Sequence, residues 1–295
     1  MKKVFLVINP CSGKTKIKDS LLDVISILND ANLETQVAIT RYHNHAIDLI
    51  KTLPPDIDCV ICAGGDGTLN QIITGLIKYN KNLPVGYIPA GSTNDFATTY
   101  GLNNNIQKAT LDITKREPHK IDIGKFSDET DSYFSYIASF GLFSAVSYET
   151  PQQVKNALGH AAYVFEGVRD LGNVRIYPVT VKLKDKIMKN EYIFGAVMNT
   201  TSIGGVVKLN ADVDMSDGLF EVVLIKNPTT VNDMVDIFNG IANSDFSSDI
   251  FDFFKVSEIE FEFEEPMSWS LDGEKRESSL NVSIKNLNKK ITIMK

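Results

Sequence analysis

The sequence has no apolar run near the roughly 18 residues that a membrane-spanning helix needs, and its longest runs, such as Val4–Ile8, are strand-sized. Its start, Met-Lys-Lys followed at once by that run, lacks the small-residue cleavage site of a secretory signal peptide. Three cysteines in 295 residues argue against a disulfide framework and for a reducing compartment. Basic residues are also few, 30 Lys and Arg against 37 Asp and Glu, and the net charge of −7 argues against nucleic-acid binding. We therefore expect a cytoplasmic protein with no transmembrane segment and no nucleic-acid partner.

What is present suits a globular chain of one or two domains, since 43% of the residues are hydrophobic and 23% are charged. Cys59 and Cys62 have the spacing of a redox or zinc pair, but both lie within an apolar run. An odd spacing on a strand points two side chains to opposite faces. We therefore expect two separate buried thiols.

The first 120 residues or so alternate between short apolar strands and helices. This alternation predicts a parallel sheet covered on both faces, a doubly wound α/β domain whose ligands bind at the carboxyl ends of the strands. The expected strands are Val4–Ile8, Thr35–Ile39, Asp58–Ala63 and Val85–Pro89, and the expected helices are Ile17–Leu28, Ala46–Leu53 and Leu69–Lys78.

After Gly124 the pattern changes to strands, several of them alternating between apolar and polar residues, which predicts an antiparallel β-sandwich. The expected strands are 133–140, 174–184, 191–199, 219–225, 256–263, 268–271, 279–284 and 290–294, and two helices are expected at about 152–171 and 231–243. We therefore expect an α/β domain, residues 1–124, completed by residues 286–295. A β-rich domain, residues 125–285, would follow, with a cleft between the two.

Two adjacent glycines, Gly64 and Gly65, end the strand predicted for Asp58–Ala63. Glycine lets the backbone turn sharply and approach a ligand that a Cβ would block. Thr68 opens the next helical run, so the loop leads into a helix N-terminus, where free N–H groups and the helix dipole favour phosphate. Asp66 would repel phosphate there unless a cation lay between them, so we interpret it as a Mg²⁺-linked or catalytic carboxylate. The alternative is a tight turn with an Asp at the surface.

The loop after the first strand, residues 8–15, ends in Gly-Lys-Thr like a Walker A loop. A Walker A loop needs a glycine five residues before Gly13, where this sequence has Ile8, and Pro10 removes an N–H that would bind phosphate. We expect a shorter strand-to-helix loop whose N–H groups and Lys14 lie near the phosphates of a nucleotide. The alternative is a plain polar turn.

A second glycine loop, Ala90-Gly91-Ser92-Thr93-Asn94-Asp95-Phe96-Ala97, follows the next predicted strand. It resembles the G-[ST]-x-N-D-F-[AG] element of the diacylglycerol kinase catalytic domain family, which includes bacterial lipid kinases and sphingosine and ceramide kinases. Other segments match in the expected order along nearly the whole chain. They are Asn9-Pro10-x-Ser12-Gly13-Lys14, Ile121-Asp122-Ile123-Gly124-Lys125, Met215-Ser216-Asp217-Gly218-Leu219-Phe220 and Ser270-Leu271-Asp272-Gly273-Glu274.

The resemblance implies a site residue by residue. It assigns nucleotide contacts to Asn9, Pro10, Cys11, Ser12, Gly13, Thr40, Gly65, Asp66, Gly67, Thr68, Leu69, Asn70, Gln71, Ser92, Asp95 and Asp122. It implies that Asp66, Asp95 and Asp122 form the acidic centre of the cleft, and that Asp272 and Glu274 lie in the motif of the catalytic base. It also implies a structural Mg²⁺ at Asp214, Asp217 and the carbonyl of Leu219. Relatives can have a glycine-rich stretch where this chain has Lys275-Arg276-Glu277, which leaves the shape of the acceptor end open.

The function implied is an ATP- and Mg²⁺-dependent lipid kinase that phosphorylates the hydroxyl of diacylglycerol or a related lipid and gives phosphatidic acid. Its partner would be a lipid at a membrane surface, with transient docking through Lys182, Lys184, Lys186 and Lys189, although a solvated hairpin is the alternative for these lysines. An NAD kinase-like phosphotransferase and a non-catalytic nucleotide or lipid sensor are the competing functions. The sequence leaves open the acceptor lipid, which of Asp272 and Glu274 is the base, and whether edge strands form a homodimer. Asp272-Gly273 also fits a plain hairpin turn.

Overall fold

The computed structural model describes residues 2–13, 16–115, 118–142, 175–200, 202–203, 207–208 and 214–294, so the helix expected at 152–171 lies outside the described residues. The chain divides into two compact units, each of which is treated by itself below. Unit 1 contains Met1–Asp122 and Lys289–Lys295, and unit 2 contains Ile123–Asn288. The chain therefore leaves unit 1 after Asp122 and returns to it at Lys289.

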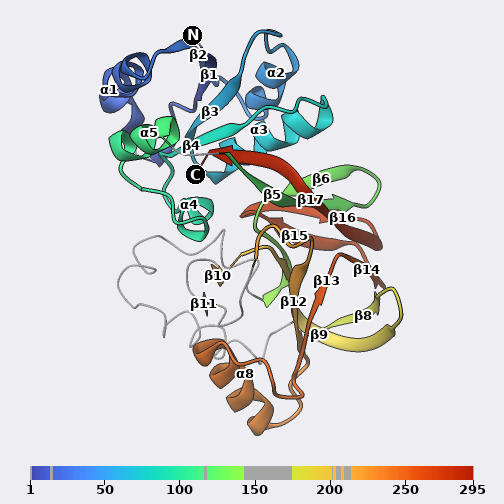
Figure 1. The fold of residues 1–295 in the computed structure, drawn as a ribbon. Coiled ribbons are helices and arrows are strands. Elements are labelled where there is room, and N and C mark those ends of the chain that lie inside the picture. The colour runs from blue at the N-terminus through green and yellow to red at the C-terminus, as the bar shows by residue number, and fades with distance from the viewer. Residues whose placement is uncertain are drawn as a thin grey trace. The chain divides into compact units, whose positions relative to one another are not determined.

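Unit 1 is built on a parallel sheet (Figure 1). Its strands lie in the order β2-β1-β3-β4, and the end of β17 extends the sheet by pairing parallel to β4, with Ile293 opposite Val85. The strand bounds are β1 Lys2–Ile8, β2 Leu33–Ile39, β3 Cys59–Gly64, β4 Val85–Pro89 and β17 Asn281–Met294. Because β1, β3 and β4 are parallel neighbours, the loops at their carboxyl ends meet at one edge of the sheet.

Helices cover both faces of this sheet. One face packs on α1 and α5, which contact each other, and the other on α2 and α3, which also form a contacting pair. The helix bounds are α1 Lys16–Asp30, α2 His45–Lys51, α3 Asp66–Lys78, α4 Asp95–Thr99 and α5 Ile106–Lys115. Cys59 belongs to the core on the α1 face whereas Cys62 does not, and both thiols are buried and unbonded, which confirms the expectation of two separate thiols.

Unit 2 is an antiparallel β structure whose longest strand, within this unit, is β9. Strand β9 pairs with β7, β8 and β12, and β12 pairs in turn with β13. Beyond β8 the order continues with β14 and the first part of β17, and beyond β7 with β15 and the edge strand β16. The bounds are β5 Pro118–Ser127, β6 Asp131–Phe134, β7 Ile137–Gly141, β8 Tyr177–Lys182, β9 Ile187–Met198, β10 Ser202–Ile203, β11 Val207–Lys208, β12 Phe220–Lys226, α8 Val231–Asn243, β13 Phe251–Val256, β14 Glu258–Phe263, β15 Met267–Leu271 and β16 Glu274–Ser278.

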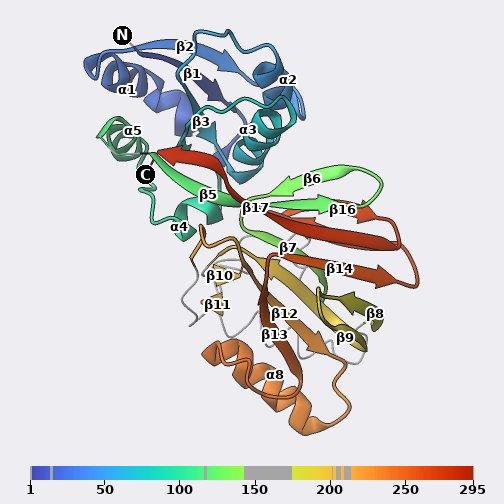
Figure 2. The same ribbon diagram turned by 45° about the vertical axis from the view of Figure 1, so that its right-hand side comes forward.

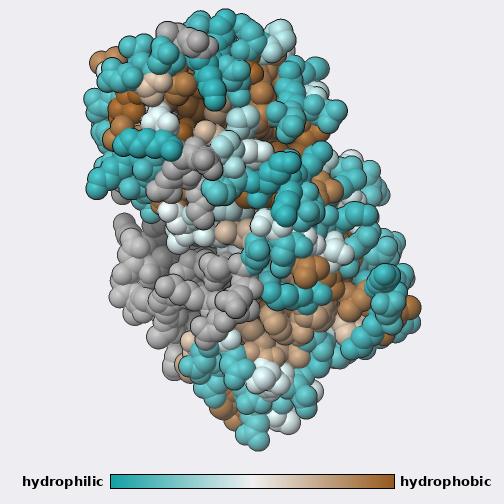
Figure 3. Space-filling model, in the orientation of Figure 1, coloured by the Kyte–Doolittle hydropathy of each residue, from teal (hydrophilic) through white to brown (hydrophobic). Residues whose placement is uncertain are grey.

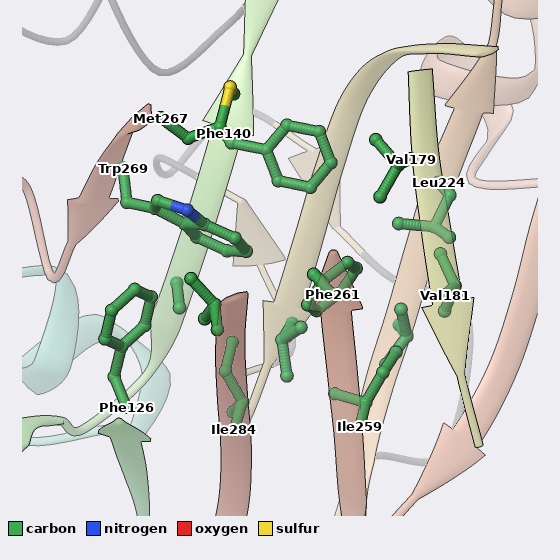
Figure 4. Packing of buried hydrophobic residues seen from close by; sticks show 14 of the residues in the cluster. Phe126, Phe140, Val179, Val181, Leu224, Ile259, Phe261, Met267, Trp269 and Ile284 are labelled. Carbon is green, nitrogen blue, oxygen red and sulfur yellow. The ribbon is translucent and has the colours of Figure 1, made fainter. Parts of the chain in front are cut away.

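An aromatic core fills the interior of unit 2. The indole ring of Trp269, 1% exposed, lies 5.2 Å from the ring of Phe126, 4.9 Å from that of Phe140 and 5.4 Å from that of Phe261, measured between centroids (Figure 4). These rings come from β5, β7, β14 and β15, so one cluster joins strands that are far apart in the sequence. Edge-to-face and tilted ring pairs of this kind stabilise a core beyond the area that they bury.

The observed elements differ from the expected ones at several places, and the sequence pattern does not predict the strands β5, β13 and β16 or the helices α4 and α5. The single strand expected at 133–140 is two strands, β6 and β7, interrupted at Ser135 and Tyr136. The separate strands expected at 279–284 and 290–294 are one continuous strand, β17, which passes from unit 2 into unit 1 (Figure 2). The third helix begins at Asp66 instead of Leu69, so most of the expected glycine loop is already the first helical turn.

The surface agrees with the polar composition of the chain. Hydrophilic residues cover much of the face seen in Figure 3, and apolar residues reach it in smaller groups. Within the described residues, no helix combines the length and the apolar character that crossing a bilayer requires.

Candidate active site

Three loops of unit 1 are fastened to one another at the carboxyl ends of β1, β3 and β4. From the first loop, the Asn9 amide donates to the Thr68 hydroxyl at 2.9 Å, and the Ser12 hydroxyl accepts from the N–H of Gly65 at 3.2 Å. Asn9 also holds its own loop, because its side-chain oxygen accepts from the N–H of Cys11 at 3.0 Å. The expected loops therefore form one polar edge on the sheet.

The glycines of these loops are required by close backbone approach. Gly13 has φ of +49°, and a Cβ there would lie 2.1 Å from the carbonyl oxygen of Ala90. A Cβ at Gly91 would lie 2.6 Å from the Cα of Gly65, so these two loops pass with no room for a side chain. Glycine is the residue that tolerates both conditions. Such an edge presents backbone more than side chains, which suits a phosphate-bearing ligand.

Asp66 organises the third loop. Its carboxylate accepts from the N–H of Asp95 at 2.9 Å, from the N–H of Phe96 at 3.2 Å and from the Tyr87 hydroxyl at 3.3 Å. It therefore binds the first N–H groups of α4, a role usually taken by a capping side chain of the helix itself. Burial raises the pKa of Asp66, while the hydrogen bonds from Asp95, Phe96 and Tyr87 oppose that rise.

Asn94 closes the same loop from within. It has φ of 54°, it is buried, and its side-chain oxygen accepts from the N–H of Gly91 at 2.9 Å while its amide donates to the Gly91 carbonyl at 3.2 Å. The Tyr87 hydroxyl also lies 3.4 Å from the Asn94 side-chain oxygen. Burial, followed by the negative charge of Asp66, raises the pKa of Tyr87, so this hydroxyl stays a hydrogen-bond donor.

Not every residue that is expected to contact the nucleotide presents its side chain at this edge of the sheet. Ser92 and Cys11 are exposed, but the Leu69 side chain is 1% exposed within the core. Thr40 follows β2 and donates its N–H to the Ile8 carbonyl at 2.8 Å, which ties it to the end of β1. Asp122 is fully buried, and its carboxylate accepts from the N–H of Lys289 at 2.6 Å, where the chain re-enters unit 1.

In unit 2, the pair Asp272-Gly273 forms the two-residue turn between β15 and β16. Both residues have positive φ, +49° and +87°, as the turn type that suits two-residue hairpins requires. Asp272 is only 4% exposed. Its carboxylate accepts hydrogen bonds from three backbone N–H groups, those of Ser135 at 2.5 Å, Tyr136 at 3.0 Å and Ile137 at 3.1 Å. The interruption between β6 and β7 thus exists where the backbone binds this carboxylate.

Glu274, two residues further on, has the opposite environment. It is the first residue of β16 and is exposed, and the described residues provide its carboxylate with no hydrogen bond or ion pair. The motif thus combines one carboxylate committed to the backbone with one that is accessible to solvent.

The expected metal loop is closed by its own side chains. Asp214 accepts from the N–H and hydroxyl of Ser216 at 2.9 and 2.7 Å, and Asp217 accepts from the N–H of Leu219 at 2.8 Å. The carbonyl of Leu219 accepts from the Asn286 amide at 3.3 Å. Asp212, a further aspartate of the same loop, lies outside the described residues. The described residues contain no group of three His, Cys, Asp or Glu placed to hold a metal ion.

Residues 3–126 match the profile of the diacylglycerol kinase catalytic domain, and residues 137–294 match that of the YegS C-terminal NAD kinase beta sandwich-like domain. The chain belongs to the diacylglycerol kinase catalytic domain family. The two profiles confirm the expected fold class, an α/β domain followed by a β-sandwich.

Named relatives of this diacylglycerol kinase family member cover most of its length. It is 29% identical to the diacylglycerol kinase of Bacillus subtilis over 93% of this chain and 90% of the relative, and 31% identical to that of Staphylococcus saprophyticus over 76% and 73%. Two crystal structures of Bacillus anthracis proteins superpose with TM-scores of 0.82 and 0.75. Each superposition covers 99% of this chain, and the two cover 97% and 96% of the Bacillus anthracis chains. Because the sequence identities are only 24% and 20%, these structures support the fold alone.

Two features of this family member were missed by sequence reasoning. The roles of Tyr87 and Asn94 in holding the Asp66 loop were not foreseen, although Asn94 lies inside a matched motif. Arg276 was noted only as a departure from relatives, whereas its guanidinium binds Asp128 at 2.6 Å. The signal for Arg276 was weak, because its partner lies 148 residues away in the sequence.

Proposed function

We propose that the protein is an ATP-dependent lipid kinase that transfers the γ-phosphoryl group to the hydroxyl of diacylglycerol and releases phosphatidic acid. One observation supports this above the others: the loops after β1, β3 and β4 are joined to one another through Asn9, Ser12 and Asp66. Phosphoryl transfer has a loose, highly charged transition state, so its catalysis depends on positioning and charge stabilisation. Loops that are fixed to each other supply that positioning.

The nucleotide would bind along this polar edge. The residues proposed to contact it are those that the family resemblance assigns, apart from Asp122, with Gly13 offering its backbone to the phosphates. Leu69 would contribute through its backbone, because its side chain lies in the core. Asp122 would act by holding β17 in place instead of by touching the nucleotide, since its carboxylate binds the N–H of Lys289.

For the base that accepts the proton of the lipid hydroxyl, we propose Glu274. A base must be reachable and must have a free lone pair. Asp272 uses its carboxylate to bind three backbone N–H groups, whereas Glu274 is exposed and has no partner among the described residues. Asp272 would therefore position the turn that carries Glu274.

Bound Mg²⁺ would neutralise charge on the phosphates and, at a separate structural site, on the acidic loop of unit 2. The donors at that loop fit a hard cation in kind, because carboxylate and carbonyl oxygens are the ligands that Mg²⁺ prefers. Asp214, Asp217 and the Leu219 carbonyl would hold the ion, with Asp217 and Leu219 already joined by a 2.8 Å hydrogen bond within the turn. Water would supply the remaining ligands.

The lipid would reach the enzyme by transient docking of this cytoplasmic protein on a membrane surface. The β8–β9 hairpin supports this, since Lys184, Lys186 and Lys189 are exposed and have no ion pair among the described contacts, and Ile187 between them is 66% exposed. Lys182 differs, because it pairs with Glu262 at 2.9 Å. We call Lys184, Lys186 and Lys189 the hairpin lysines. Each lysine near an anionic surface contributes about 1 kcal/mol.

The experiment that tests the function is incubation of the purified protein with labelled ATP, Mg²⁺ and separate acceptors: diacylglycerol, ceramide, a sphingoid base and NAD. Labelled phosphatidic acid from diacylglycerol is expected. Labelled NADP would replace the proposal with an NAD kinase. Nucleotide binding without any labelled product would favour a sensor.

A further inference from the structure

The β15–β16 hairpin, which carries Glu274, lies at an edge of its sheet. Among the described strands, β16 pairs with β15 alone. An edge strand with one neighbour is held by fewer backbone hydrogen bonds than a central strand. Side-chain contacts therefore decide how firmly Glu274 is placed.

Arg276 supplies such contacts. One guanidinium nitrogen, Nη1, donates to the Ser132 hydroxyl at 2.5 Å, and the other, Nη2, donates to the Asp128 carboxylate at 2.6 Å and to the Thr130 hydroxyl at 2.9 Å. The guanidinium carbon also lies 5.2 Å from the centre of the Phe126 ring. The planar guanidinium group binds three residues and stacks on an aromatic ring, and a lysine side chain could not make all of these contacts.

The ion pair with Asp128 is shielded from water. The Asp128 side chain is 6% exposed and that of Arg276 is 21% exposed. Breaking one side of a shielded pair leaves the other charge uncompensated, which is far more costly than the loss of a surface pair. By contrast, the pair of Lys275 and Glu277 on the same strand is about 60% exposed on both sides.

Two contacts thus fasten the hairpin to one stretch of chain. Asp272 binds the backbone of residues 135–137, and Arg276 binds residues 128–132. Glu274 lies between these two points and shares a face of β16 with Arg276, because alternate residues of a strand point the same way. The Arg276 guanidinium binds Asp128 even though Glu274 is its neighbour on that face.

We propose that Arg276 is a positioning residue for Glu274, and that Asp128 holds the guanidinium charge so that Glu274 stays unpaired and basic. This inference rests on the proposed function, because it assumes that Glu274 is the base. The other charged groups near it are engaged: Lys275 with Glu277 at 2.9 Å, and Asp131 with Lys125 at 2.8 Å. The Asp272 carboxylate binds backbone.

The test separates charge from geometry through the pH dependence of kcat/KM for lipid phosphorylation, whose acid limb reports the pKa of the base. Asp128→Asn frees a positive charge beside Glu274, so the acid limb should move to lower pH by about half a unit. Arg276→Gln leaves Asp128 unbalanced, and the limb should move up by about the same amount. The double variant should return the limb to its wild-type position.

Geometry has its own readout. Arg276→Lys keeps the charge but not the fork, so kcat should fall about 10-fold or more while the acid limb stays in place and the KM for ATP is unchanged. Lys275→Ala is the matched control, since it removes an exposed pair on the same strand, and it should behave as wild type. Circular dichroism and melting temperature show that each variant is folded.

The outcomes are distinguishable. If wild type phosphorylates no lipid, or Glu274→Gln keeps full activity, the proposed function or its base is wrong. If Glu274→Gln is inactive but Asp128→Asn and Arg276→Gln leave the acid limb unmoved, or move it in the same direction, the inference is overturned. An Arg276→Lys variant with wild-type kcat would overturn the positioning role.

Discussion

Replacing Asp66 with asparagine tests the contact between the start of α3 and the loop that leads into α4 in unit 1. The substitution keeps the shape of the side chain, but one oxygen becomes an amide group that can only donate. That amide faces either the N–H of Asp95 or the N–H of Phe96 and the Tyr87 hydroxyl, so at least one buried donor loses its acceptor. The loop that leads into α4 is then released from α3.

The magnitude follows from these contacts. A hydrogen bond to a charged group contributes about 1.5–3 kcal/mol, and a buried donor left without a partner costs about 1–3 kcal/mol. Removal of a carboxylate whose charge is disfavoured by burial recovers part of this. We expect a net loss of about 2–4 kcal/mol, which lowers the melting temperature of unit 1 by about 6–15 °C. Phosphoryl transfer should be lost with it.

Calorimetry of wild type, Asp66→Asn and the control Tyr87→Phe measures this effect. The control removes one longer hydrogen bond to the same carboxylate and should cost about 1 kcal/mol. The pH dependence adds a second readout, since burial raises the folded pKa of Asp66 above its ordinary value of 3.8. The proton then stabilises the folded state below pH 3.8, and this stability is lost as the pH rises through the raised pKa. The advantage of wild type over Asp66→Asn should therefore shrink across that window. Equal melting of all three proteins would refute the reasoning.

Three further predictions follow from the other sites. Glu274→Gln should lower kcat by about 100-fold or more with unchanged melting and nucleotide affinity, whereas Asp272→Asn should also lower the melting temperature; the reverse pattern would exchange their roles. Changing the three hairpin lysines to glutamate should weaken co-sedimentation with vesicles that contain anionic lipid at low salt, and unchanged binding would remove the hairpin from the docking face. Asp217→Ala should lower the melting temperature in Mg²⁺ and make it insensitive to EDTA; wild-type melting that never responds to Mg²⁺ would show that this loop holds no ion.

The α/β half of the chain could be predicted closely because its signals are local. Short apolar strands and amphipathic helices can each be recognised from the pattern of a few consecutive residues. Once the strands are predicted to be parallel, it follows that their carboxyl ends lie at the same edge of the sheet. The helix that begins at Asp66 shows the limit of this approach. The same residues can end a loop or form a first helical turn, and only the hydrogen bonds that the N–H groups of Thr68 and Leu69 donate to the Gly65 carbonyl distinguish the two.

The β-rich half was harder because its decisive contacts are distant in sequence. The interruption between β6 and β7 depends on the Asp272 carboxylate, which comes 135–137 residues later. Likewise, the strand β16 has charged residues on both faces, a pattern that is typical of a loop. The contact that holds it as a strand, from Arg276 to the β5–β6 hairpin, is distant in the sequence. Periodicity carries no information about such partners.

The same limit applies to the aspartates of the matched motifs. A carboxylate that binds a cation and one that binds backbone N–H groups can occupy the same motif position, because nearby positive dipoles stabilise both. Three motif aspartates, Asp66, Asp122 and Asp272, bind backbone N–H groups from segments that come after or before them by 29 to 167 residues. Each therefore fixes the place where two distant segments meet. In a kinase, whose rate depends on placement of charged groups, such a joint affects catalysis without contact with the reacting atoms. Loss of activity on mutation cannot by itself identify a base, and the pairing of kinetics with melting temperature in the Glu274 and Asp272 variants is what separates the two roles.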